Sequence, residues 1–131
     1  MSNQSTRGRS LMDRLTAGSV LCAEGYLFEL ERRGYLQAGA FVPEVVLEFP
    51  EVVMALHRDF LRAGSDVIEA FTYYGHREKL RLIGKEDRLE PLQHNALAIA
   101  QEVASEASGE PPLVAGKAPV AGVNTPSPSL R

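Results

Sequence analysis

The chain has 131 residues, and its 44% hydrophobic and 24% charged residues are typical of a globular protein. Its formal charge of −3 gives no clustered positive field, so we expect neither nucleic acid nor an anionic membrane surface as a partner. A single cysteine, Cys22, excludes an internal disulfide framework. No apolar run approaches the ~20 residues that span a bilayer, and the polar start lacks a signal's apolar core. We therefore expect one cytoplasmic domain.

Short apolar runs and amphipathic segments alternate from residue 11 to residue 116. Residues 19–23 form the first apolar run, which is typical of a buried strand. Residues 27–33 are predicted to be helical, because two leucines share one face and two arginines occupy the last turn. Gly34 follows as a left-handed cap.

The middle of the chain contains the clearest predicted helix. Residues 51–63 carry an apolar stripe at helical spacing, and Gly64 supplies the stop. Residues 66–72 are rich in branched and aromatic side chains and predict a second strand. The charged segment 76–88 is predicted to be part helix and part loop.

A last amphipathic helix is predicted to begin near Pro91, and residues 113–116 resemble the opening of a third strand. Strands that alternate with helices in this way predict an α/β fold with parallel pairing and right-handed crossovers. Residues 38–43 are predicted to be a connection between elements.

The size of the repeating units limits the architecture. Val20, Val67 and Leu113 are 47 and 46 residues apart, whereas an eight-stranded barrel needs about 250 residues in all. The chain is therefore either a small open sheet or a piece of something larger. Residues 1–10 are expected to be flexible, and the Pro-rich, non-periodic residues 117–131 are expected to be a disordered tail.

Five motifs occur in order along the chain: LTAG at 15–18, AEGY at 23–26, LERRGY at 30–35, HRDFLRAGS at 57–65 and FTYY at 71–74. Together they resemble the N-terminal part of the betaine–homocysteine S-methyltransferases, within the homocysteine S-methyltransferase family. The resemblance implies a zinc-dependent (β/α)8 TIM barrel that transfers a methyl group from betaine to the sulfur of homocysteine, forming methionine. On this basis residues 11–116 would be the first two to three β/α units of the barrel.

The resemblance also implies where homocysteine binds. In the family its amino-acid end lies near an acidic residue and glycine after the first strand, which match Glu24 and Gly25. The family more often has Asp followed by two glycines, so this chain has a longer acid and one glycine fewer. The alternative is that Glu24 is an ordinary polar residue at a strand end.

Aromatic residues match the betaine side of the family's site. Thr72, Tyr73 and Tyr74 follow the second predicted strand, and Phe41 stands where the family can carry a tryptophan. Barrel chemistry lies at the carboxyl ends of strands, and aromatic faces attract quaternary ammonium groups. The alternative is that the tyrosines pack at a barrel rim and that Phe41 covers a neighbour.

The family holds zinc with three cysteines in regions that this chain does not contain. Cys22, inside the first predicted strand, is expected to be a buried core residue. His57 is expected to be structural, His94 to lie on a solvated helix face, and His76 to lie near the site; their spacing matches no zinc motif. We therefore expect no metal ligand, no catalytic residue and no cofactor bound to this chain alone.

Two functional hypotheses follow. The leading one is an N-terminal fragment of such a methyltransferase that carries part of the substrate site and is inactive alone. Its resemblance stops near Gly116, as in a truncated gene, a splice product or a frameshift. The alternative is a non-catalytic interaction fragment, because open strand edges and apolar helix faces favour association with a full-length subunit or with itself. Relatives that use S-methylmethionine share the barrel, so the methyl donor stays open.

Overall fold

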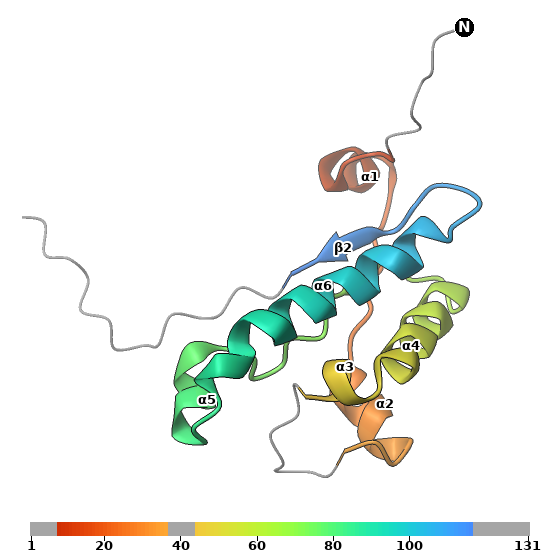
Figure 1. The fold of residues 1–131 in the computed structure, drawn as a ribbon. Helices are drawn as coiled ribbons and strands as arrows, with labels where there is room; N and C mark the ends of the chain where they lie inside the picture. Colours follow the sequence, from red (N-terminus) through yellow and green to blue (C-terminus); the bar gives the residue numbers. More distant parts are fainter. Residues whose placement is uncertain (1–7, 37–43, 117–131) are drawn as a thin grey trace, which may run out of the picture.

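The computed structural model of this chain describes residues 8–36 and 44–116. Its helices and strands (Figure 1) are α1 (Leu11–Ala17), α2 (Tyr26–Arg32), α3 (Val45–Glu48), α4 (Pro50–Arg62), β1 (Val67–Glu69), α5 (Arg77–Leu82), the 3-10 helix η1 (Glu86–Arg88), α6 (Leu89–Ser105) and β2 (Leu113–Ala115). Residues 1–7 of the predicted flexible start, the predicted connection at 38–43 and the predicted tail at 117–131 lie outside the described ranges.

The two strands pair in parallel, with Val67 opposite Leu113 and Glu69 opposite Ala115. The connection between them carries α5, η1 and α6, and α6 lies along β2 (Figure 1). The predicted helix, strand, helix and strand after residue 50 are confirmed, as is the parallel pairing. The described part of the chain is therefore mixed α/β, and the carboxyl ends of both strands meet at one edge of the sheet.

The strand predicted at residues 19–23 is wrong in extent, because this segment forms only a single parallel bridge, between Cys22 and Val67. Cys22 was also predicted to be buried, and it is exposed. Side chains alternate along an extended chain, and Ala23 faces the helices with 3% exposure. Cys22 consequently points to the opposite face of the sheet, beside Val67, which lies outside the main hydrophobic cluster.

Side chains end the pairing on both sides of this bridge. The Leu21 N–H donates to Oδ2 of Asp66 (2.9 Å), and the Leu21 carbonyl accepts from the Asp66 N–H (2.7 Å). At the other end, the Glu69 N–H donates to the hydroxyl of Tyr26 (3.2 Å). The segment around Cys22 and β1 therefore share one backbone bridge, with a side-chain hydrogen bond on each side of it, and do not form a longer row of paired residues.

Two helices were not predicted from the sequence. α1 begins at a capping box, in which Ser10 and Asp13 exchange side-chain and backbone hydrogen bonds. The short helix α3 packs against α6 and α4, and its Val45 and Val46 are buried. α3 has four residues, too few for an apolar period to be recognisable. For α1 the Ser-x-x-Asp pattern at its start was a signal that the sequence analysis did not use.

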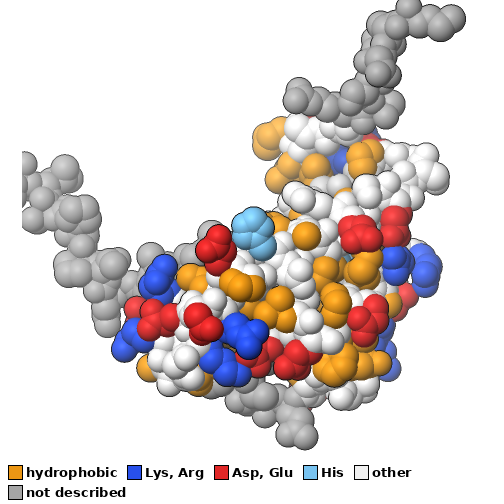
Figure 2. All heavy atoms as spheres, viewed as in Figure 1, with side chains coloured by type: hydrophobic (Ala, Val, Ile, Leu, Met, Phe, Trp, Pro, Cys, Tyr) orange, Lys and Arg blue, Asp and Glu red, His pale blue; other side chains and the backbone are white. Residues whose placement is uncertain are grey.

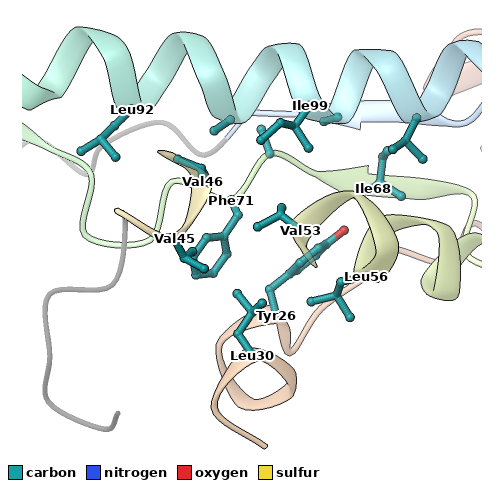
Figure 3. Close-up of a cluster of buried hydrophobic side chains, with 14 of the residues drawn as sticks. Tyr26, Leu30, Val45, Val46, Val53, Leu56, Ile68, Phe71, Leu92 and Ile99 are labelled. Atoms are coloured by element: carbon teal, nitrogen blue, oxygen red, sulfur yellow. The ribbon is translucent and has the colours of Figure 1, made fainter. Parts of the chain in front are cut away.

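A single hydrophobic cluster joins α2, α3, α4 and α6 across β1 (Figure 3). Full burial of one leucine, isoleucine or valine stabilises the fold by about 1.5–3 kcal/mol, so the helices are held mainly by this cluster. The largest fully buried side chains among the described residues are Leu30, Leu56, Ile68, Leu80, Leu92, His57, Val46, Val53 and Val103, and all of them except His57 belong to this cluster.

The surface is mixed in character. Figure 2 shows acidic and basic side chains interspersed over the body of the protein, with apolar side chains on α1 and between the charged groups. None of the helices in residues 8–36 and 44–116 is both long and apolar enough to cross a lipid bilayer.

The Asp66 carboxylate provides a first test of this fold. Asp66→Ala removes the acceptor for the Leu21 N–H, and we expect it to lower the free energy of unfolding by about 1–2 kcal/mol. Asp66→Asn retains an acceptor oxygen and should cost less than half of that. Urea unfolding of the three proteins measures both values, and equal losses in the two variants would contradict this role of the side chain.

Candidate functional site

A pocket of about 280 Å³ lies where the chain leaves the Cys22 bridge and where it leaves β1. Two short segments form its walls, one at the start of α2 and one after β1. The residues that line it are Glu24, Gly25, Tyr26, Leu27, Phe28, Glu69, Phe71, Thr72 and Tyr73. Four of the six predicted site residues are thus brought together: Glu24, Gly25, Thr72 and Tyr73.

Gly25 allows the sharp turn from the bridge into α2. It is the N-cap of this helix, with φ +82° in the left-handed region that favours glycine. The turn leaves the exposed side chain of Glu24 on one wall of the pocket and the buried ring of Tyr26 beside it. A residue with a Cβ at position 25 would strain this wall.

Thr72 and the tyrosine pair form the opposite side. The rings of Tyr73 and Tyr74 have centroids 4.1 Å apart, and a hydrogen bond between the hydroxyls raises the pKa of Tyr73. Tyr74 does not line the pocket; it lies behind Tyr73 with its ring 4.8 Å from Nζ of Lys79. The φ of Tyr74 is +59°, a strained value for a bulky residue, and such strain often marks functional sites.

One polar atom in the pocket wall lacks a partner. Oγ1 of Thr72 is buried and has no hydrogen-bond partner among the described residues. Buried hydroxyls are normally satisfied, so this atom is an exception in the pocket wall. Phe41, the remaining predicted site residue, lies outside the described residues.

Sequence reasoning missed several lining residues, of which Glu69 and Tyr26 matter most. Glu69 ends β1 and adds a second carboxylate to the walls that carry Glu24. No sequence signal marked it, because Phe71, on the same face of the predicted strand, was not a predicted site residue. The pocket therefore combines two carboxylates with aromatic rings, a lining that favours a small cationic group.

Tyr26 connects the pocket to the core. Its hydroxyl lies 2.9 Å from Nδ1 of His57 and accepts from the Glu69 N–H. Figure 3 shows Tyr26 pointing from α2 toward α4. His57, which was predicted to be structural, is fully buried, and its burial lowers its pKa from 6.5 to about 4. Burial likewise raises the pKa of Tyr26.

The other metal candidates do not gather at this site. His94 is exposed on α6, as predicted. His76 is the N-cap of α5 and is not among the residues that line the pocket. Across residues 8–36 and 44–116, no three His, Cys, Asp or Glu side chains lie close enough to hold a metal ion. The described residues therefore do not provide a set of ligands that fits the zinc implied by the sequence resemblance.

Comparison with known proteins assigns the family. The family model described as homocysteine S-methyltransferase matches residues 24–127, which is most of the chain and includes the whole pocket. The chain belongs to the homocysteine S-methyltransferase family. The match also runs past Gly116, where the sequence resemblance was expected to stop.

Within this family, the chain is similar to the N-terminal portion of betaine–homocysteine S-methyltransferases, as predicted. It is 44% identical over 111 residues to betaine–homocysteine S-methyltransferase 1 of Danio rerio and 41% identical over 113 residues to that of Rattus norvegicus. Each comparison covers 82% of this chain and 27% of the relative. The chain thus spans about a quarter of the length of these relatives.

Solved structures support the fold. The metallated form of the homocysteine methyltransferase MmuM from Escherichia coli superposes with a TM-score of 0.68. The superposition covers 81% of this chain and 40% of that structure, at 24% sequence identity. At this identity the likeness establishes the shared fold of the homocysteine S-methyltransferase family and no more.

The buried His57 predicts a pH dependence of stability. Its pKa is 6.5 when exposed and about 4 in the folded chain, so only the unfolded state takes up this proton between those values. The unfolded state then binds more protons, and stability falls as the pH drops from 6.5 to 4, by about 3 kcal/mol in all. Above pH 6.5 the histidine contributes no slope.

The variant His57→Asn isolates this contribution, because it cannot titrate and keeps an acceptor at the position of Nδ1. We expect its free energy of unfolding to fall less steeply than that of the wild type between pH 7 and pH 4, measured by urea unfolding at each pH. Carboxylates paired with arginines add their own loss near pH 4 in both proteins. Parallel curves for the two proteins would show that His57 does not titrate in this way.

Proposed function

We propose that this chain supplies part of the homocysteine site of a methyltransferase that transfers a methyl group from betaine to the homocysteine sulfur, forming methionine. The single observation that carries the proposal is the pocket at the carboxyl end of β1. It brings Glu24 and Gly25 together with Thr72 and Tyr73, which are distant in sequence. Family membership and the similarity to betaine–homocysteine S-methyltransferases support the substrate class.

The lining suggests a role for each side chain. The carboxylates of Glu24 and Glu69 suit the ammonium group of an amino acid, because an ion pair inside a partly enclosed pocket is stronger than one in water. Oγ1 of Thr72 offers a hydrogen bond to a carboxylate or an amine. The rings of Tyr73 and Phe71 offer faces that attract the trimethylammonium group of betaine.

The proposal extends to the architecture of the complete enzyme. We propose that β1, β2 and the segment around Cys22 are neighbouring strands of a (β/α)8 barrel, in which sites lie at the carboxyl ends of the strands. Zinc, when bound, would hold the homocysteine thiolate as a nucleophile, and its ligands would come from outside this chain. The chain alone is then inactive in methyl transfer. We place the enzyme in the cytoplasm.

Binding of L-homocysteine to the 131-residue chain tests the proposal, with isothermal titration calorimetry as the measurement. Glu24→Gln removes one carboxylate from the pocket and should weaken binding about tenfold, since a charged hydrogen bond contributes about 1.5–3 kcal/mol. Glu51→Gln changes an exposed carboxylate at the start of α4 and serves as the control. Absence of binding, or equal weakening by both variants, would contradict the proposed site.

A second candidate function is self-association. Within the described residues β2 pairs only with β1, and Leu11, Met12 and Leu15 of α1 are 46%, 69% and 48% exposed. An open strand edge beside exposed apolar side chains favours pairing with another chain, and we take a second copy as the partner.

Sedimentation velocity over a hundredfold range of chain concentration tests this candidate. We expect the weight-average mass to rise with concentration, and Met12→Lys to suppress the rise because a charge would enter the contact. Glu90→Lys, on the exposed start of α6, is the control for added charge. A monomer at every concentration would rule out self-association. If the chain is instead recovered together with a co-expressed full-length subunit, the partner is that subunit and not a second copy of this chain.

A further inference from the structure

The pocket begins where backbone pairing between its two walls stops. The Val67 N–H donates to the Leu21 carbonyl (3.1 Å), and the Ala23 N–H donates to the Val67 carbonyl (2.8 Å). In a parallel ladder the next bond would run from the Glu69 N–H to the Ala23 carbonyl. The Glu69 N–H donates instead to the hydroxyl of Tyr26. The side chain of Tyr26 therefore takes the place of one backbone–backbone hydrogen bond between the two segments.

This replacement changes the separation of the two walls. A hydrogen bond from the Glu69 N–H to the Ala23 carbonyl would hold the backbone after Ala23 at the spacing of paired strands, about 4.8 Å from β1. With Tyr26 between them, the backbone at Gly25 turns away into α2, and Glu24 and Glu69 lie on opposite sides of an open space. The pocket occupies the gap where the ladder would have continued.

His57 fixes the hydroxyl of Tyr26 in this position. If the hydroxyl donates to Nδ1 of His57 while accepting from the Glu69 N–H, the proton of the imidazole lies on Nε2, and only that N–H has no partner among the described residues. If Nδ1 carried the proton, both Nε2 and the hydrogen of Tyr26 would lack partners. Buried polar groups without partners are costly, so the first arrangement is favoured.

We propose that Tyr26 and His57 are positioning residues that hold the two walls of the pocket apart: the Glu69 N–H donates to the Tyr26 hydroxyl, and this hydroxyl donates to Nδ1 of His57. Neither residue is required to touch the substrate through its polar atom. The consequence for substrate binding rests on the function proposed above, whereas the spacing of the walls does not.

The ring of Tyr26 has a separate packing role. Its centroid lies 4.7 Å from that of Phe60 and 6.2 Å from that of Phe71, and it is 5% exposed. Tyr26→Phe keeps this packing and removes only the hydroxyl. The variant therefore separates the hydrogen-bond role from the role of the ring in the core.

The experiment compares four variants of the full chain. Tyr26→Phe removes the hydroxyl, His57→Leu removes the acceptor, and His57→Asn keeps an acceptor oxygen at the position of Nδ1. Val103→Ala, at a buried position in α6, is the control that loses stability and leaves the side chains of Tyr26 and His57 in place. Two quantities are measured for each: hydrogen exchange of the Glu69 amide relative to that of Ile68, and the Kd for L-homocysteine.

We expect Tyr26→Phe to accelerate exchange at Glu69 about tenfold relative to Ile68 and to raise the Kd about tenfold. His57→Leu should change both quantities about fivefold. Effects of this size correspond to the loss of a single hydrogen bond. His57→Asn should stay within about twofold of the wild type in both measurements. The 15N resonances of His57 in the wild type should show a proton on Nε2 and none on Nδ1.

A purely structural role is distinguished by the control. If Val103→Ala changes the relative exchange and the Kd as much as Tyr26→Phe, or if His57→Asn behaves as His57→Leu, the proposal is wrong. If the wild-type chain does not bind L-homocysteine, the proposed function fails, and the exchange at Glu69 together with the tautomer of His57 still decides the positioning role.

Discussion

The backbone of Asp66 sets the register on which the rest of the structure depends. Its N–H donates to the Leu21 carbonyl, its side chain accepts from the Leu21 N–H, and its carbonyl accepts from the Leu113 N–H on the other side. One residue thereby aligns three segments that are more than 40 residues apart in sequence. Because parallel strands share a direction, this single alignment places the carboxyl ends of all three segments at the same edge. The helices then need only cover one face to bury the core.

That one-sided cover explains the exposure of Cys22. The helices pack against the face that carries Ala23 and Ile68, whereas Cys22 lies on the other face. Parallel sheets normally have both faces covered. Within the described residues β2 pairs only with β1. Its outer edge could pair with the next strand of the proposed barrel or with the second copy in the proposed self-association, and these two proposals use the same edge for different partners.

Periodicity predicted those parts of the fold whose stability comes from long apolar faces. The helix at 50–62, the strand at 67–69 and the helix at 89–105 were located to within a few residues for this reason. The strand at 19–23 failed because its ends are fixed by two side chains, Asp66 and Tyr26, which pattern reasoning does not see. In the pocket, Glu24 and Thr72 were found through motifs, but Glu69 was not, because its role depends on which residue lies across the gap and not on its own neighbours in sequence.

The location of the pocket follows from the same competition between backbone and side chain. A ladder that continued past Ala23 would satisfy the Glu69 N–H directly, but it would leave no space between the walls. The chain satisfies this N–H with a hydroxyl. Among the described residues, Oγ1 of Thr72 in the pocket wall and Nε2 of His57 behind Tyr26 have no hydrogen-bond partner, and Tyr74, next to Tyr73, has a left-handed backbone. Each of these features lowers stability, and each belongs to a residue that lines the pocket or contacts a residue that lines it. They are the physical reason to regard the opening as a binding site rather than as a defect of a small sheet.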